Sequence, residues 1–369
     1  MAESENIGGN DHFFEGVEKL LEIWFAPNPK NKNADLRKIP RPLWDALLKS
    51  VRCEIISFTR NDNIDAYVLS ESSMFVSKRR WILKTCGTTT PLQCLQPLLD
   101  LAVKIGGYAE IEDLFYSRKN YKKPELQCSP HRAFDEEVAF LDQYFEDGRA
   151  YSLGSVNGDC WYLYTVCRGG GDSSLVMDNT HPKNSNLIEQ VANNNSPPDP
   201  DQTIEILMTE LDPEIMSIFT KDECSTANEA TERAGIHKII PGMVVDDFLF
   251  DPCGYSMNGV LKNCGKGYSN GCYMTIHITP EPEFSYVSFE SNISSANYGD
   301  LIARVIETFQ PGKFVVTIFA NKTSDAFTAS RELEHHTSIK QWKRDELQFC
   351  RFPTYDLIYA HYYKFKFPS

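Results

Sequence analysis

Residues 66–77, A-Y-V-L-S-E-S-S-M-F-V-S, consist of two apolar segments separated by a polar one. The apolar segments contain Tyr, Val and Phe, which are residues that favour strands. Between them, Ser70, Glu71, Ser72 and Ser73 place three hydroxyl groups around one carboxylate. Serine side chains commonly bond to the backbone of tight turns. The stretch therefore predicts a turn between two strands, and it leaves open why so many hydroxyl groups gather there.

The pattern of residues 66–77 recurs along the chain, and it defines the fold class. Alternation of apolar and polar residues predicts strands at 160–164, 273–278, 284–290, 314–319 and 355–367. Helical periodicity is clearest at 92–105, 132–145, 225–236 and 298–309. Strands and helices do not alternate regularly, which favours antiparallel sheets with helices on their outer faces, an α+β sandwich. Residues 13–25 fit a helix or a strand equally well.

The overall composition excludes several classes of protein. The chain has 369 residues, a formal net charge of −14 and 12% aromatic residues. This acidic balance argues against binding to the phosphate backbone of nucleic acids and suits small cationic ligands. No apolar run is long enough to span a membrane, and the first residues lack the features of a signal peptide. We therefore expect a cytoplasmic protein without membrane contact.

The cysteines and one biased segment indicate local features. Eleven cysteines without a C-x-x-C pair predict reduced thiols, with neither a disulfide framework nor a metal site. Cys264 and Cys272 flank a Gly/Asn-rich tract that is either a hairpin tip or a clip closed by the two thiols. Residues 168–200 are rich in Gly, Asn, Ser and Pro, which predicts a flexible surface loop.

Two rows of polar residues occur where strands are expected. Asp201, Thr203 and Glu205 are spaced by two residues and would share one face of a strand. On an exposed face this row has no special meaning, whereas on a buried face its acids would need cationic partners. A second row consists of Tyr273, Thr275, His277 and Thr279. A lone histidine on a strand is either a structural residue or a base, and the pattern does not decide.

Six stretches together resemble one known family, eukaryotic S-adenosylmethionine decarboxylase, the pyruvoyl-dependent family of polyamine synthesis. They are HFFEGVEKLLEIWF, YVLSESSMFVSKRRWILKTCGTTT, LFYSRKNYKKPELQ, DPDQTIEILMTELDP, DPCGYSMNG and TIHITPEPEFSYVSFE. The resemblance extends from residue 12 to about residue 319. It implies a four-layer αββα sandwich, a single domain over residues 1–369, a homodimer, and a strand over most of residues 13–25.

The resemblance also implies a reason for the hydroxyl groups of the first stretch. The Ser72 hydroxyl would attack the Glu71 carbonyl and form an ester, and β-elimination would then separate residues 1–71 from residues 72–369. Position 72 would become a covalent pyruvoyl group, which would form a Schiff base with S-adenosylmethionine and release CO2. No separate cofactor would be needed. Ser70 and Ser73 are expected to be ordinary turn residues.

The family's functional positions carry over to this sequence one by one. The implied catalytic residues are Ser72, Cys86, Ser256, His277, Glu15 and Glu18. Cys86 would return a proton to the substrate α-carbon, and His277, paired with Ser256, would be the base of the β-elimination. The implied substrate-binding residues are Phe14, Glu71, Phe250 and Glu281. Of these, the two phenylalanines would hold adenine between their rings.

The same resemblance implies a binding site for putrescine between the sheets. The positions concerned are Asp201, Thr203, Glu205, Glu290, Glu22, Lys19, Lys84, Phe115, Ser117 and Phe319. A dication neutralises several acids at once, which would make their burial tolerable. Two other classes of function are alternatives, although neither has a use for a scissile Glu71–Ser72 bond with the full set Ser72, Cys86, Ser256 and His277. One is a cleavage-incompetent regulatory paralogue that activates an active partner, and the other is a purine-binding protein without catalysis.

Overall fold

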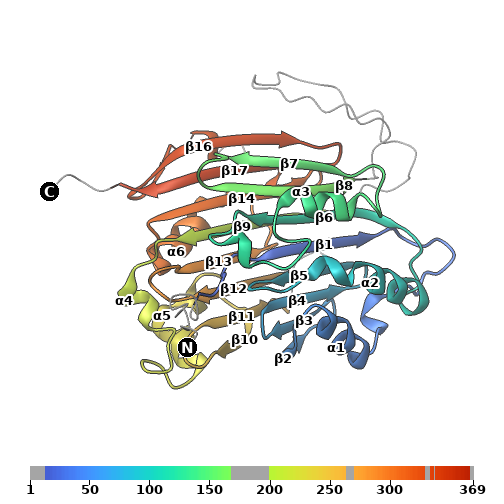
Figure 1. Cartoon of the computed structure of the whole chain (residues 1–369), viewed down its shortest axis with the longest axis horizontal. Coiled ribbons are helices and arrows are strands. Elements are labelled where there is room, and N and C mark those ends of the chain that lie inside the picture. Colours follow the sequence, from blue (N-terminus) through green and yellow to red (C-terminus); the bar gives the residue numbers. More distant parts are fainter. Residues whose placement is uncertain (1–12, 168–198, 263–269, 329–332, 336, 366–369) are drawn as a thin grey trace, which may run out of the picture.

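The computed structural model describes residues 13–167, 199–262, 270–328, 333–335 and 337–365 (Figure 1). Almost all of the loop predicted at 168–200 lies outside the described residues. Cys264 also lies outside them, so the question of a clip with Cys272 stays open. Within the described residues, no helix is both long enough and apolar enough to cross a membrane.

Two antiparallel sheets form the centre of the molecule. The first has the strand order β2 (Ile55–Arg60), β3 (Ile64–Leu69), β4 (Ser72–Ser77), β5 (Arg80–Thr85), β1 (Lys19–Phe25), β6 (Ile111–Lys119), β8 (Cys160–Cys167) and β7 (Arg149–Gly154). The second has the order β10 (Val244–Leu249), β11 (Tyr255–Val260), β12 (Tyr273–Thr279), β13 (Tyr286–Ser291), β9 (Gln202–Thr209), β14 (Lys313–Asn321), β17 (Tyr355–Lys364), β16 (Trp342–Arg351) and β15 (Ser338–Ile339).

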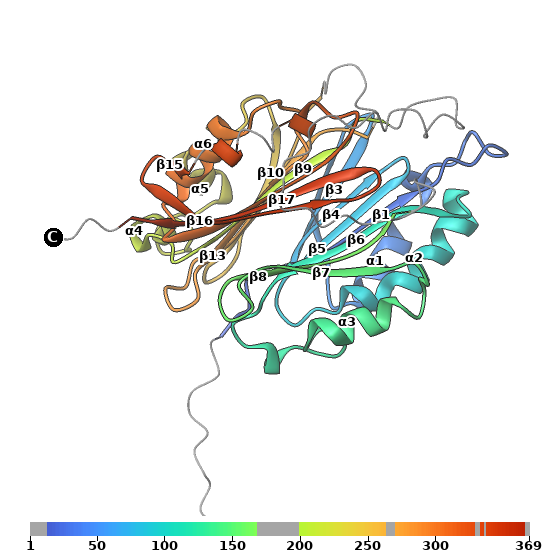
Figure 2. The same cartoon turned by 90° about the horizontal axis from the view of Figure 1, so that it is seen from above.

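The sheets stack face to face, and helices cover the outer face of each (Figure 2). The first sheet is covered by α1 (Arg41–Ser50), α2 (Leu95–Leu101) and α3 (Phe134–Leu141). The second is covered by α4 (Pro213–Ser217), α5 (Ala227–Ala234) and α6 (Gly299–Phe309). The predicted αββα sandwich is therefore confirmed, and each predicted strand and helical segment contains the expected element.

The stretch that predicted a turn is a hairpin. Leu69 at the end of β3 pairs with Ser72 at the start of β4, so Ser70 and Glu71 form a two-residue connection. The ambiguous segment 13–25 contains β1 from Lys19 onward and no regular element before it. The strand alternative was correct for its second half, because β1 pairs with β5 and β6 in the middle of the sheet.

The apolar core lies mainly between each sheet and its own helices. Leu21, Ile23 and Met74 belong to the cluster under α1–α3, and Ile276 and Phe289 to the cluster under α4–α6. Complete burial of such a side chain contributes roughly 1.5–3 kcal/mol. The layer between the two sheets is different, because charged and hydroxyl side chains separate two smaller apolar clusters there. The outer layers therefore stabilise a sandwich whose interior is partly polar.

Candidate active site between the sheets

Ser72 occupies an unusual backbone conformation at the start of β4. Its φ angle is 117°, a region that residues other than glycine rarely adopt, and the residue is 2% exposed. Holding a residue in such a region costs on the order of 1–3 kcal/mol. Ser72 Oγ donates a hydrogen bond to Glu18 Oε1. The hairpin thus presents a strained backbone and a hydroxyl group in contact with a buried carboxylate.

Glu18, directly before β1, is charged although it is buried. Burial alone would raise the pKa of its carboxyl group, but the Lys84 ammonium 3.6 Å away and the contacts with His277, Ser288 and Ser72 outweigh burial and lower that pKa. A carboxylate with a low pKa accepts hydrogen bonds only. Glu18 therefore accepts a hydrogen bond from the Ser72 hydroxyl, which places it where a general base for that hydroxyl must lie.

The carbonyl group that precedes Ser72 has a fixed hydrogen-bond donor. The Cys86 backbone N–H, just after β5, donates to the Glu71 carbonyl oxygen at 3.1 Å. The next residue, Gly87, donates its N–H to the Glu15 carbonyl at 2.8 Å and has a φ of +60°. The chain after β5 is thereby fixed to the segment before β1. A donor in this position can stabilise negative charge on the Glu71 carbonyl oxygen.

His277 on β12 lies across from the hairpin, within a group of hydroxyl side chains. Its Nδ1 is 2.8 Å from Ser256 Oγ on β11, and its Nε2 is 3.0 Å from Ser73 Oγ and 2.8 Å from Thr275 Oγ1. Burial lowers the pKa of His277 to about 4, despite the nearby Glu18. The ring is therefore neutral at pH 7, and it can accept a proton.

Ser73 differs from the expectation of an ordinary turn residue. It is fully buried, and besides His277 it contacts Asn258 Oδ1 at 2.7 Å and Thr275 Oγ1 at 3.3 Å. Its hydroxyl joins β4 of the first sheet to β11 and β12 of the second. Ser70 does behave as a turn residue, because its Oγ accepts the Glu54 N–H at 3.0 Å.

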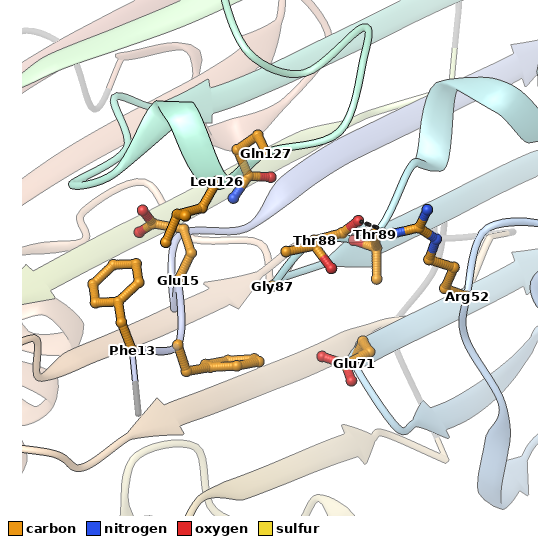
Figure 3. A pocket seen from close by; sticks show the side chains of 10 residues that line it. Phe13, Glu15, Arg52, Glu71, Gly87, Thr88, Thr89, Leu126 and Gln127 are labelled. Atoms are coloured by element: carbon orange, nitrogen blue, oxygen red, sulfur yellow. Dashed lines mark hydrogen bonds between the residues drawn. The ribbon is translucent and has the colours of Figure 1, made fainter. Parts of the chain in front are cut away.

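A cavity of about 190 Å³ opens next to the hairpin (Figure 3). It is lined by Phe13, Phe14, Glu15, Arg52, Glu71, Gly87, Thr88, Thr89, Leu126 and Gln127. Figure 3 shows Glu71 and Arg52 on the side opposite Phe13 and Glu15. Three predicted positions, Phe14, Glu15 and Glu71, therefore share one cavity. Phe250 and Glu281 are not among its lining residues, and Phe250 instead packs edge-on against Phe248 at 4.8 Å.

Cys86 directly precedes Gly87, one of the residues that line this cavity. Burial raises the pKa of its thiol well above the usual value, and the Glu71 carboxylate adds to that rise. The sulfur is 3.8 Å from Glu71 Oε2. Burial also raises the pKa of the Glu71 carboxyl group. The thiol is therefore protonated at pH 7, and it can act as a proton donor.

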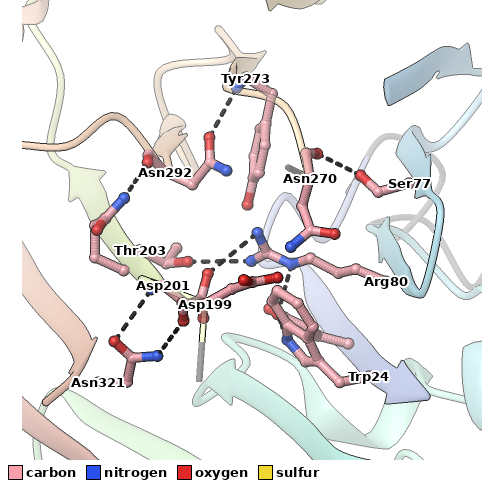
Figure 4. A network of polar contacts seen from close by, with 12 residues as sticks. Trp24, Ser77, Arg80, Asp199, Asp201, Thr203, Asn270, Tyr273, Asn292 and Asn321 are labelled. Atoms are coloured by element: carbon pink, nitrogen blue, oxygen red, sulfur yellow. Dashed lines mark hydrogen bonds and ion pairs between the residues drawn. The ribbon is translucent and has the colours of Figure 1, made fainter. Parts of the chain in front are cut away.

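A second polar group lies farther along the space between the sheets. Arg80 Nε donates to Glu22 Oε1 at 2.7 Å, and Arg80 is 3.5 Å from Asp201 and 3.3 Å from Thr203 Oγ1. Figure 4 shows its guanidinium group between Trp24, Asp201 and Thr203. The exposed-face alternative for the row Asp201, Thr203 and Glu205 is therefore wrong, because both acids are buried and have cationic partners.

Lys84 joins this second group to the hairpin. Its Nζ is 2.7 Å from Glu290, 3.2 Å from Glu205 and 3.6 Å from Glu18. Burial alone would lower the pKa of Lys84, but the three carboxylates raise it. Burial raises the pKa of Glu205 to about 7 in spite of Lys84. One buried ammonium thus contacts both Glu18 at the hairpin and the acids of the second group.

An aromatic cluster borders the second group, and one predicted member of that group lies elsewhere. The Phe319 ring stacks on the Tyr355 ring with 4.6 Å between the ring centres, and the Phe115 ring lies edge-on to both. Ser117 lies on the same strand as Phe115 and is buried.

Lys19 donates to Gly87 O at 2.9 Å and to Gln127 Oε1 at 3.2 Å. The structure therefore does not bring Lys19 to the interior acids.

Sequence reasoning missed several residues of these two groups. They are Ser73, Asn258, Arg80 and Tyr355. Asn258 lies two residues after Ser256 on β11, so the spacing of a strand was enough to place both side chains on one face. For Arg80 and Tyr355 there was no local signal, because their partners are far away in the sequence.

Comparison with known proteins gives a consistent result. The family model for adenosylmethionine decarboxylase matches residues 11–363. The S-adenosylmethionine decarboxylase proenzyme of Drosophila melanogaster is 56% identical over 357 residues, covering 96% of this chain and 97% of the relative. The Xenopus laevis proenzyme is 49% identical, covering 96% of both chains. A crystal structure of a Trypanosoma brucei AdoMetDC-delta26 monomer has a similar fold, with a TM-score of 0.55 and 24% identity over 79% of this chain and 99% of that one.

Proposed function

The chain belongs to the adenosylmethionine decarboxylase family, and from this premise we propose that it cuts its own Glu71–Ser72 bond with the side chains between the sheets. It is an S-adenosylmethionine decarboxylase, a pyruvoyl-dependent lyase made as a proenzyme. One observation carries the proposal for the residues. The hydroxyl of the strained Ser72 donates a hydrogen bond to the buried Glu18 carboxylate, while the Glu71 carbonyl oxygen accepts a hydrogen bond from the Cys86 N–H.

In the first proposed step, an acyl group moves from nitrogen to oxygen. Glu18 takes the proton of the Ser72 hydroxyl, and Ser72 Oγ attacks the Glu71 carbonyl carbon. The Cys86 N–H stabilises the negative charge that develops on the carbonyl oxygen. The C–N bond then breaks as Glu18 returns the proton to the Ser72 nitrogen, and an ester results. A hydroxyl group is a weak nucleophile without such a base, so the Glu18 contact supports this role.

In the second proposed step, the ester is eliminated. His277 removes the Ser72 Cα proton, the Cβ–Oγ bond breaks, and the Glu71 carboxylate leaves. Residue 72 becomes dehydroalanine, which takes up water and loses ammonia to give the pyruvoyl group. Two observations support this role. The His277 ring is neutral, and its Nε2 lies 3.0 Å from the Oγ of Ser73, the residue that follows Ser72. Ser256 Oγ lies 2.8 Å from His277 Nδ1, which supports a role of Ser256 in orienting the imidazole ring.

The two products, residues 1–71 and 72–369, would remain one domain. The smaller chain contributes β1, β2 and β3, and β1 pairs with β5 and β6 of the larger chain. Seven residues of β1 are buried. Separating the chains would therefore break the middle of the first sheet, and we expect them to stay associated after cleavage.

The residues around the hairpin fit the pyruvoyl group and its substrate. The pyruvoyl group supplies a carbonyl that captures the substrate amine and accepts electrons as CO2 leaves. In the adjoining cavity, the Phe14 ring and the Glu15 and Glu71 carboxyl groups suit adenine and a cationic sulfonium. For Phe250 and Glu281, the proposal of substrate binding rests on the family resemblance alone.

Replacing Cys86 with alanine tests the proposed proton donor. Cleavage should continue, because the N–H that holds the Glu71 carbonyl belongs to the backbone. Because the proton is returned after CO2 has left, the first turnover should still release CO2, whereas repeated turnover should slow by roughly 10²–10⁴-fold, the usual contribution of a positioned acid. Electrophoresis of the products and CO2 release measure the two effects separately. The matched control is Cys94→Ala, a buried thiol in the turn before α2. A normal rate of CO2 release over many turnovers by Cys86→Ala would refute the assignment.

We also propose that putrescine binds among the interior acids. This interior group contains five carboxyl groups and two cationic side chains, so its net charge at full ionisation is −3. The acids are Glu18, Glu22, Asp201, Glu205 and Glu290, and the cations are Arg80 and Lys84. A buried excess of negative charge is costly, and a dication reduces it. Lys84 contacts both Glu18 and the farther acids, which supports an effect of putrescine on the hairpin.

Added putrescine should therefore accelerate cleavage or decarboxylation in polyamine-free protein. Butylamine, a monoamine of similar length, should be less effective because it carries one charge. In Asp201→Asn, roughly tenfold more putrescine should be needed, since a bond to a charged group is lost. Asp222→Asn, at an exposed position, is the control. An unchanged response in Asp201→Asn, or none in the unmodified chain, would contradict the proposal.

The family resemblance also supports a homodimer and a cytoplasmic location. Sedimentation of the purified chain tests the first, and imaging of the tagged chain in cells tests the second. Dimers are expected to have twice the mass of one cleaved protomer.

A further inference from the structure

Asp113 on β6 is a buried acid that the proposed reaction does not use. It is 6% exposed, and its Oδ1 has no hydrogen-bond partner among the described residues, while the Cys167 thiol on the neighbouring strand β8 bonds to the same carboxyl group. Within the same part of the chain, no Lys, Arg or His nitrogen forms an ion pair with it. Burying a carboxylate without a counter-ion is unfavourable. Asp113 therefore has an unmet need for a hydrogen-bond donor or a cation.

The register of the first sheet places Asp113 beside the second polar group. Asp113 lies directly across from Trp24, and Phe115 lies across from Glu22. Residues spaced by two share a face, so Asp113, Phe115 and Glu22 all point toward the second sheet. Burial, followed by the charges of Glu112 and Asp201, raises the pKa of Asp113 to about 7, although the Cys167 thiol and the charge of Arg79 act in the opposite direction. The influence of Asp201 locates Asp113 near the acids contacted by Arg80.

The side chains next to Asp113 indicate what kind of cation fits. Tyr355 donates to Asp201 Oδ2 at 3.2 Å, and its ring stacks on Phe319 with Phe115 edge-on to both. Aromatic faces attract organic ammonium groups and pack against their methylene stems. A metal ion would instead need several more oxygen ligands. The surroundings therefore favour an aliphatic ammonium.

Arg80 does not form an ion pair with Asp113. Its guanidinium group is engaged by Glu22 at 2.7 Å, by Thr203 at 3.3 Å and by Asp201 at 3.5 Å. We propose that Asp113 is a further carboxylate of the diamine site and binds one ammonium group beside Phe115, Phe319 and Tyr355. This inference rests on the proposed binding of putrescine. It adds a residue that determines how tightly the diamine binds.

The test is calorimetric titration of putrescine into the cleaved, polyamine-free protein and into its Asp113→Asn variant. The amide keeps the size of the side chain but removes the charge. The dissociation constant should rise roughly 10- to 100-fold, the contribution of a hydrogen bond to a charged group. Glu112→Gln is the matched control, because it removes the adjacent carboxylate, which pairs with Arg79. Its dissociation constant should change less than threefold, by the usual size of surface charge effects.

Thermal unfolding supplies a second measurement that separates ligand binding from a structural role. Without putrescine, Asp113→Asn should be as stable as the unmodified protein or more so, since a buried acid without a counter-ion has been replaced by a neutral amide. With saturating putrescine, the unmodified protein should gain more stability than the variant. If the variant binds as tightly as the unmodified protein, the role of Asp113 is refuted and the putrescine site stands. If the unmodified protein binds no putrescine, both are refuted.

Discussion

Replacing Ser72 with alanine is expected to leave the chain as one uncut polypeptide of 42.0 kDa without decarboxylase activity. The Oγ atom is both the proposed nucleophile and the atom that leaves in the elimination, so no other group of the hairpin substitutes for it. Loss of activity should be complete, because no pyruvoyl group forms. Denaturing electrophoresis and CO2 release from S-adenosylmethionine measure the two consequences.

Ser70→Ala is the matched control for this variant. Ser70 is in the same turn, but its Oγ accepts the Glu54 N–H and does not contact Glu18. The Ser70→Ala variant should be cleaved and active, and circular dichroism should show that both variants are folded. Cleavage of Ser72→Ala between residues 71 and 72 would refute the assignment of the nucleophile. Cleavage failing equally in Ser70→Ala would show that the turn, and not the Ser72 hydroxyl, is what the reaction needs.

His277→Ala is expected to stop the reaction after the acyl shift. Glu18 and the Cys86 N–H, which serve the first step, remain in place, whereas the base of the elimination is lost. The ester should therefore accumulate, and the final rate of cleavage should fall by roughly 10²–10⁴-fold. Hydroxylamine attacks esters and spares amides, so it should cut the variant between residues 71 and 72 and leave Ser72→Ala intact.

The control for His277→Ala is His361→Ala. His361 is also largely buried, but it contacts Asp345 and Asp159 at the opposite end of the second sheet. It should be cut at the normal rate without hydroxylamine. A normal rate of cleavage in His277→Ala would contradict its role as the base. An uncut chain that resists hydroxylamine would show that His277 is needed for the first step.

Much of the fold was predictable because local patterns determine it. The alternation in residues 273–278 and 314–319 predicted strands, and β12 and β14 confirm them. The serine-rich stretch predicted a turn, which is present at Ser70 and Glu71. Its strained φ at Ser72 could not be predicted, because serine has no intrinsic preference for that conformation and the contacts of the hairpin impose it.

The polar interior was less predictable, because it depends on which face of each strand is covered. The row from Asp201 to Glu205 gave no sign of burial until Arg80 and Lys84 of the other sheet were located. Lys19 illustrates the opposite error. It is three residues before Glu22 in the sequence, so strand alternation places the two side chains on opposite faces of β1. Counting by two from Glu22 would have separated Lys19 from the interior acids.

Denaturing mass spectrometry of the purified chain tests self-cleavage at Glu71–Ser72 most directly. We predict two polypeptides, residues 1–71 and residues 72–369. The larger one should lack a free amino group at its N-terminus and gain the mass of two hydrogen atoms on reduction with borohydride. A single intact polypeptide of 42.0 kDa in an active preparation, or a cut at another bond, would contradict the account.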